Sequence, residues 1–154
     1  MKEDKEFELI IEDIISNQAV QEMKKYRQHY NTSCFEHCTN VARISYNICK
    51  KLKLDYRAVA RAAMLHDLFL YDWRVRQEGR KGLHAFKHPK VALENASKLF
   101  RLSKKEQDII LKHMWPLTIK LPRYPESYVV TLVDKYSTIS ESFAYYRKKF
   151  FYKK

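Results

Sequence analysis

The chain has 154 residues, which is enough for one domain with a substantial hydrophobic core. Its 30 Lys and Arg outnumber its 18 Asp and Glu, and the resulting formal charge of +12 favours a polyanionic partner such as a phosphorylated metabolite, nucleic acid or an acidic surface. The absence of any apolar run of about 18 residues excludes a membrane-spanning helix.

Residues that favour turns are scarce, with only 2 Gly and 4 Pro in the chain. A β-rich fold of this length needs more of them, so the composition predicts an all-α protein, a single-domain bundle of about six to seven helices over residues 1–154. The three cysteines show no disulfide spacing, and residues 1–13 lack the apolar core of a signal peptide. We therefore expect a cytoplasmic protein with reduced thiols.

Helices in the first half of the chain are indicated by apolar periodicity and by capping residues. The spacing predicts a helix over 3–15 and a short one over 19–26. Ser33 and Glu36 have the spacing of a capping box, which opens a helix to about residue 52. Asp55 is a favourable N-cap for the next helix, which is expected to reach residue 70.

The segment 71–86 contains both glycines and many charges, and it is predicted to be a loop. His88-Pro89 then starts another helix, to about residue 100. Proline is favoured at the first helical position because its missing N–H has no partner there.

Ser103 and Glu106 form a second capping box, which opens a helix to about His113. A long helix over 127–150 follows, and its end interleaves aromatic and basic residues. We expect this end to pack on the domain with a solvated edge, although the composition also suits single-stranded nucleic acid or an acidic membrane.

Four histidines fall near the ends of separate predicted helices: His37, His66, His88 and His113. Neutral imidazole is a favoured ligand of transition metals, and carboxylates add oxygen ligands. His66 is followed directly by Asp67, and neighbouring residues on a helix lie about 100° apart, so both side chains could bracket one ion.

Asp134 ends an apolar stretch over 129–134 that is expected to lie in the core. A buried carboxylate is costly unless it is paired, hydrogen-bonded or bound to a metal. Two interpretations remain open at this point, namely a metal ligand or a salt bridge to an arginine such as Arg43, Arg57 or Arg61.

The order of His37, His66-Asp67 and Asp134 resembles the defining pattern of the HD superfamily. The resemblance covers about residues 30–140 and includes the small and apolar residues that precede His66. It implies a helical, metal-dependent phosphohydrolase in which His66 and Asp67 are catalytic and a metal-bound hydroxide attacks the phosphoester.

His88 and His113 lie where a subset of the superfamily, similar to the HDIG-type phosphodiesterases, places two further ligands. This resemblance implies one or two divalent ions, of Fe, Mn, Ni or Co. One ion would be held by His37, His66, Asp67 and Asp134, and the second by Asp67, His88 and His113. His84 remains an alternative to His88 because residues four apart share a helix face.

Two departures bear on the substrate. Leu68-Phe69 replaces the Ile-Gly that follows the His-Asp pair in HDIG proteins, and no Gly-Tyr-Pro motif is present, so cyclic-di-GMP specificity is not expected. No P-loop motif is present either. The expected substrate is a small, nucleotide-like phosphorylated metabolite.

Basic residues near the predicted ligands could hold the substrate phosphates: Lys87, Arg80, Lys112 and Lys135. Exposed surface charge is the alternative for each. A non-catalytic module that binds a metal or a phosphorylated signal, and a nucleic-acid-binding protein, are the competing functions. Cys34 and Cys38 flank His37, but a second pair of zinc ligands is missing, so both are expected in the core.

Overall fold

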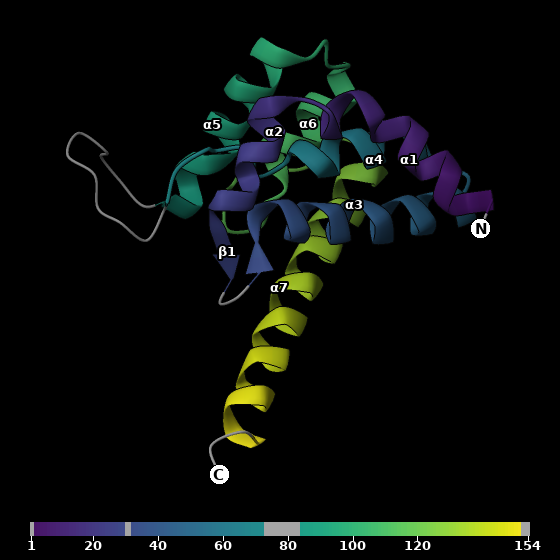
Figure 1. The fold of residues 1–154 in the computed structure, drawn as a ribbon. Coiled ribbons are helices and arrows are strands. Elements are labelled where there is room, and N and C mark those ends of the chain that lie inside the picture. Colours follow the sequence, from purple (N-terminus) through teal and green to yellow (C-terminus); the bar gives the residue numbers. More distant parts are fainter. Residues whose placement is uncertain (1, 30–31, 73–83, 152–154) are drawn as a thin grey trace.

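A computed structural model of the chain describes residues 2–29, 32–72 and 84–151. Within these residues it contains seven α-helices, one 3₁₀ turn and one small hairpin, which confirms the all-α prediction (Figure 1). In chain order the elements are α1 (Lys2–Ile15), α2 (Gln18–Glu22), η1 (Met23–Lys25), β1 (Arg27–His29), β2 (Thr32–Ser33), α3 (Cys34–Lys51), α4 (Tyr56–Leu65), α5 (His84–Leu99), α6 (Lys104–Lys112) and α7 (Pro125–Phe151). None of the described helices is long and apolar enough to cross a bilayer.

The predicted helix caps are present. Ser33 Oγ accepts a hydrogen bond from the backbone N–H of Glu36 at 3.2 Å, and the Glu36 carboxylate accepts one from the backbone of Ser33 at 2.9 Å. The same reciprocal box starts α6 at Ser103, and Asp55 caps α4 through a 3.1 Å bond from the backbone of Ala58. These local bonds satisfy N–H groups that a helix start leaves without partners.

The helix α4 lies at the centre of the bundle and contacts α1, α3, α5, α6 and α7. Ala60, Ala62 and Ala63 are completely buried, and their small side chains let α3 and the other neighbours approach closely. This packing places the C-terminal end of α4 inside the protein, together with His66 and Asp67, which follow it.

The prediction that α4 reaches residue 70 is wrong, because the helix ends at Leu65. His66 Nδ1 bonds the carbonyl of Ala63 at 2.7 Å, and Leu70 has a left-handed φ of 52°. The Leu68 carbonyl accepts a 2.8 Å bond from the Asn95 side chain on α5 instead of continuing the helix. Asp67 therefore lies beyond the helix, and the 100° relationship expected with His66 does not apply.

Two other boundaries differ from the prediction. The helix α5 begins at His84, so Pro89 lies inside the helix and not at its first position. The segment 19–26 forms α2 and η1 instead of one helix, and the antiparallel pair of β1 and β2, which was not predicted, follows it. Most of the predicted loop, residues 73–83, lies outside the described residues.

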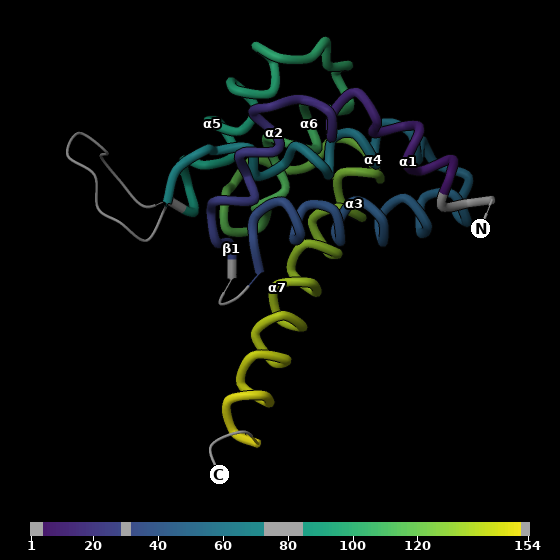
Figure 2. Tube along the Cα trace, in the orientation of Figure 1, coloured from purple at the N-terminus to yellow at the C-terminus, as the bar shows by residue number. Residues whose placement is uncertain are grey.

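The long helix α7 packs against α3, α4 and α6 in its first half and then extends away from the body of the protein (Figures 1 and 2). Its second half was expected to pack on the domain, but Phe143 is 69% and Phe150 is 83% exposed. In consequence the protein has a compact helical body and a projecting helical arm.

Candidate metal centre

Five helices bring the six predicted ligands to one place inside the body. His37 lies in the first turn of α3, His66 and His113 directly follow α4 and α6, and the others lie after α4, in α5 and in α7. All are at most 8% exposed: His37, His66, Asp67, His88, His113 and Asp134.

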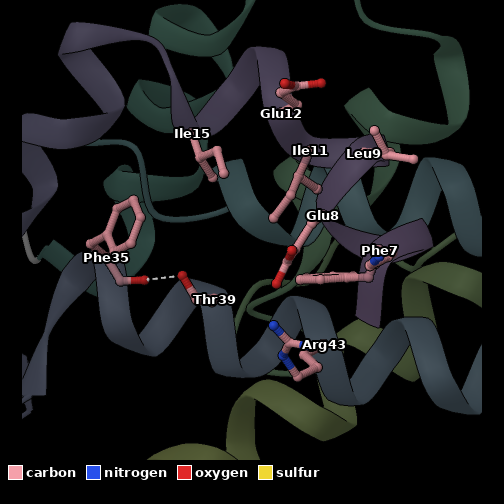
Figure 3. Close-up of a pocket in the computed structure, with 10 residues that line it drawn as sticks. Phe7, Glu8, Leu9, Ile11, Glu12, Ile15, Phe35, Thr39 and Arg43 are labelled. Carbon is pink, nitrogen blue, oxygen red and sulfur yellow. Dashed lines mark hydrogen bonds between the residues drawn. The ribbon is translucent and has the colours of Figure 1, made fainter. Parts of the chain in front are cut away.

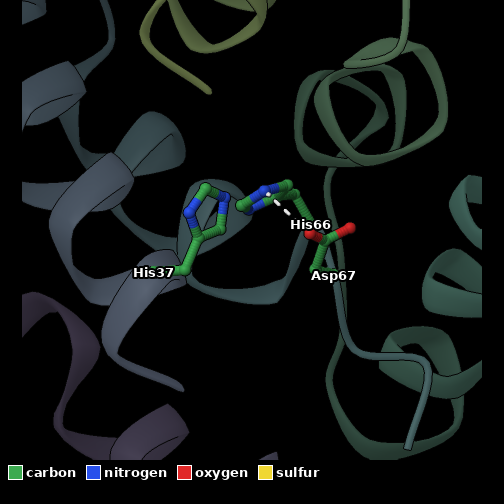
Figure 4. Close-up of side chains that lie close together, drawn as sticks. All are labelled: His37, His66 and Asp67. Atoms are coloured by element: carbon green, nitrogen blue, oxygen red, sulfur yellow. Dashed lines mark ion pairs between the residues drawn. The ribbon is translucent and has the colours of Figure 1, made fainter. Parts of the chain in front are cut away.

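One part of the cluster is formed around Asp134. Its Oδ1 atom lies 3.0 Å from His37 Nε2 and 3.6 Å from His66 Nε2. His66 Nε2 is also 3.5 Å from Asp67 Oδ2. Figure 4 shows the rings of His37 and His66 side by side, with Asp67 next to His66. Asp134 pairs with histidines here, while Arg61 pairs with Asp13, so the alternative of an Asp134–Arg61 salt bridge is not observed.

The other part of the cluster is formed around the second oxygen of Asp67. Its Oδ1 atom lies 3.2 Å from His88 Nε2 and 3.6 Å from His113 Nε2, and the two imidazole nitrogens are 2.8 Å apart. The two carboxylate oxygens of Asp67 thus face different histidines. Asp67 connects the two parts of the cluster.

Backbone carbonyls define the tautomers of two of the rings. Nδ1 of His66 lies 2.7 Å from the carbonyl of Ala63, and Nδ1 of His113 lies 2.8 Å from that of Ile110. A carbonyl oxygen only accepts, so each Nδ1 must donate. When these rings are neutral, Nε2 of each carries a lone pair directed into the cluster, and Nε2 of His66 is buried without a hydrogen-bond partner.

Burial and neighbouring charges shift the protonation of the cluster in opposite directions. Burial disfavours the charged form of His37, but hydrogen bonds to Asp134 and Glu141 raise its pKa well above the ordinary value. Burial also opposes ionisation of Asp67, yet the charges of His66 and His88 lower its pKa. For His113, burial and repulsion from His88 lower the pKa to about 3. Ionised carboxylates therefore lie beside imidazoles, which is a suitable donor set for a cation.

The described residues contain three groups whose ligand atoms lie within 4.8 Å of one another. These groups are His37–His66–Asp67, His66–His113–Asp134 and Asp67–His88–His113. Together they include all six predicted ligands and no other residue. Imidazole lone pairs and carboxylate oxygens that converge in a buried space fit a divalent transition metal, because unpaired buried acceptors are otherwise costly.

A family profile described as HD domain matches residues 34–139, about two thirds of the chain. The chain belongs to the HD-domain family. The matched range begins three residues before His37 and ends five after Asp134, so it contains the whole cluster. No curated protein and no solved structure matches the chain.

Membership of the HD-domain family confirms the resemblance to the HD superfamily that was based on the sequence. Proteins of this family are in general metal-dependent phosphohydrolases. The clustered histidines and aspartates of this HD domain support binding of divalent metal. The closer resemblance to the HDIG-type subset stays a prediction.

Two residues that contact the cluster of the HD domain were not predicted from the sequence. The Gln28 side chain on β1 donates a hydrogen bond to Asp67 Oδ2, and Glu141 Oε1 on α7 accepts one from His37 Nδ1 at 3.0 Å. Glu141 follows Asp134 by seven residues, two helical turns, so the face shared with Asp134 is a signal that could have found it. Gln28 lies on a short strand and offers no such pattern.

The four residues predicted to hold phosphate have different positions in the HD domain. Lys87 is exposed on α5, and Arg80 lies outside the described residues. The Lys112 ammonium pairs with Asp108 on its own helix. Lys135 donates to the carbonyl of His113 at 3.2 Å, and burial lowers its pKa. Lys135 is therefore the candidate that lies directly beside the cluster. The side chain of His84, the alternative to His88 as a metal ligand, also falls outside the described part of the chain.

The cysteines near the cluster are buried, as expected, and form no disulfide. The thiol of Cys34 donates to the carbonyl of Asp67 at 3.2 Å. Burial raises the pKa values of Cys34 and Cys38. A neutral thiol is a poor metal ligand, so Cys34 supports the backbone next to the aspartate.

A separate pocket lies between α1 and α3, with a volume of about 530 Å³. Figure 3 shows Phe7, Ile11 and Phe35 around it, and the Arg43 guanidinium lies 4.6 Å from the centre of the Phe7 ring. None of its lining residues belongs to the six clustered ligands. Its walls are mainly apolar, and its two basic residues, Lys5 and Arg43, are matched by two acidic ones, Glu8 and Glu12, so the lining has no net positive charge to attract a phosphoryl group.

Proposed function

We propose that the chain hydrolyses a phosphomonoester or phosphodiester of a small, nucleotide-like metabolite at a centre of two divalent transition-metal ions. The observation that carries this proposal is the position of Asp67, whose two carboxylate oxygens face different histidines. His37, His66, Asp67 and Asp134 would hold one ion. Asp67, His88 and His113 would hold the other.

Bound ions of this kind lower the pKa of water toward 7 and stabilise negative charge on phosphoryl oxygens. The residues around the ligands orient the imidazole rings. The carbonyls of Ala63 and Ile110 fix the tautomers of His66 and His113, and Glu141 does the same for His37. Such outer partners keep ligand rings oriented and raise their basicity.

The position of the charges supports an anionic substrate. The ammonium of Lys135 lies beside the His113 backbone, and Lys87 is on the same helix as His88. The formal charge of +12 attracts anions to the protein as a whole. A phosphorylated substrate would place its anionic group toward the cations of the centre.

The test combines metal analysis with turnover of bis(p-nitrophenyl) phosphate and p-nitrophenyl phosphate. We expect the purified protein to contain about two ions per chain and to hydrolyse one of these esters. Asp67→Ala should lose metal and at least about a hundredfold in turnover, because a shared ligand is removed. Asp13→Ala, on α1 and outside the cluster, is the matched control and should retain both.

Two other results of this test would support the competing functions, a metal-binding module and a nucleic-acid-binding protein. A protein that holds metal but turns over no phosphoester, including a panel of nucleotides, would be a metal-dependent binding module. Binding of nucleic acid that persists in Asp67→Ala and weakens steeply with salt would assign the basic surface to nucleic acid instead.

A further inference from the structure

One side of α7 carries a row of exposed apolar side chains that begins beside the body and continues along the projecting part of the helix. Its members alternate at spacings of four and three residues, and each is between 55% and 83% exposed: Leu132, Tyr136, Ile139, Phe143, Tyr146 and Phe150. We refer to these six residues as the α7 seam. Spacings of four and three repeat every seven residues, which is the pattern of a left-handed coiled coil.

The α7 seam lies on the opposite side of the helix from the face that packs on the body. Val130, Asp134 and Ser137 are buried against the body. Asp134 is two residues from Tyr136, which corresponds to about 200° around the helix. The contacts of α7 with its own body therefore leave the seam exposed along its length.

A partner helix would stabilise this arrangement. Most helices in proteins depend on tertiary packing of an apolar face, and the second half of α7 has little. The seam would remove about 700 Å² of each chain from water, since a whole aromatic side chain presents roughly 150–250 Å². A standard specific interface buries about 800 Å² per partner, so the seam is large enough for a stable contact.

We propose that α7 pairs with α7 of a second copy of this chain as an antiparallel two-helix coiled coil. A two-fold axis makes such an interface self-complementary, so a single seam suffices. In the register centred between Ile139 and Phe143, Ile139 of each chain faces Phe143 of the other chain. Tyr136 then faces Tyr146, and Leu132 faces Phe150, so all six side chains of each seam are matched.

Charge favours the antiparallel over the parallel arrangement. The end of α7 contains three consecutive basic residues, Arg147, Lys148 and Lys149, and no acidic residue follows Glu141 in this helix. Parallel helices would place these two groups beside each other, where like charges repel. Antiparallel helices place the groups at opposite ends of the pair.

The first test measures the mass of the wild-type chain in solution by sedimentation or light scattering. We expect twice the mass of one chain at micromolar concentration. Ile139→Glu should halve the mass and reduce the helical signal in circular dichroism, because a charge enters the middle of the seam. Ile119→Glu is the matched control, since Ile119 is 99% exposed but lies before α7, and it should stay a dimer.

The second test fixes the direction of the helices. In the antiparallel pair, Ile139→Cys alone should not cross-link to its copy, whereas an Ile139→Cys and Phe143→Cys double variant should. The native cysteines are buried and do not interfere. A monomeric wild type overturns the proposal, and so does equal disruption by Ile119→Glu. Binding of the monomer to vesicles of acidic phospholipid, lost in Ile139→Glu, would assign the seam to a membrane surface.

Discussion

Nδ1 of His37 on α3 lies 3.0 Å from Oε1 of Glu141 on α7, 104 residues later in the chain. The opposite nitrogen of the same ring, Nε2, faces Asp134 at 3.0 Å. A carboxylate accepts only, so Glu141 holds the Nδ1 proton and leaves Nε2 to face the cluster. One helix thus supplies both a candidate ligand and the group that orients its neighbour.

Replacement of Glu141 should weaken metal binding without removing a ligand. We expect Glu141→Gln to lower the affinity about 10–100-fold, since its amide can donate to Nδ1 and favour the wrong tautomer of His37. Titration with Mn²⁺ or Co²⁺ measures the change. Glu94→Gln, an exposed residue on α5, is the control. Equal affinities of the two variants would mean that Glu141 has only a structural role.

Loss of His113 should separate the two proposed ions. His113→Ala removes a ligand from the group around Asp67 Oδ1, so we expect the bound metal to fall from two ions per chain toward one, together with loss of turnover. His88→Ala should behave in the same way. His84→Ala, four residues earlier, should keep both ions. If His84→Ala loses an ion and His88→Ala keeps both, then His84 is the metal ligand and His88 is not.

Metal affinity should rise with pH. In the metal-free protein, the pKa values of His37 and His66 are raised well above the ordinary value of about 6.5, so each ring holds a proton that the metal must displace. From about pH 6 to about pH 8 we expect up to a tenfold gain per pH unit for each displaced proton. Titrations in matched buffers give the slope, and a flat profile would contradict protonated histidines.

The same protons link folding of the metal-free protein to pH. A raised pKa contributes stability that is fully present below about pH 6.5 and is lost as pH rises through the folded value. We expect thermal unfolding to occur at lower temperature at about pH 8 than at about pH 6.5 without metal. His113 acts in the opposite direction, because its pKa is lowered to about 3 and only its unfolded form binds protons near pH 6.5, so it offsets part of this loss.

Arg61 should affect stability and leave metal binding unchanged. Its guanidinium makes two hydrogen bonds to Asp13 on α1, at 2.6 and 2.8 Å, and lies 3.3 Å from Glu106 on α6. Arg61→Ala should lower the free energy of unfolding by about 1–2 kcal/mol, because these partly exposed pairs connect three helices. Denaturant unfolding measures this. Arg57→Ala, exposed on the same helix, should change stability by less than about 0.5 kcal/mol.

The sequence by itself determined the features that depend on neighbouring residues. The capping bonds at Ser33, Asp55 and Ser103 reach only three residues along the chain, so their spacing was sufficient to predict where three helices begin. The order of histidines and aspartates along the chain was sufficient to predict the family, because that pattern can be seen without the fold. Scarcity of glycine and proline was enough for the helical class.

Only the tertiary structure decided where α4 ends, which residues support the cluster and which face of α7 is exposed. Asn95 binds the Leu68 carbonyl across 27 residues, Gln28 reaches Asp67 across 39, and Glu141 reaches His37 across 104. Contacts of this range depend on how whole helices pack, and local propensity does not encode them. The same holds for α7, whose seam is exposed because the body packs against its opposite face.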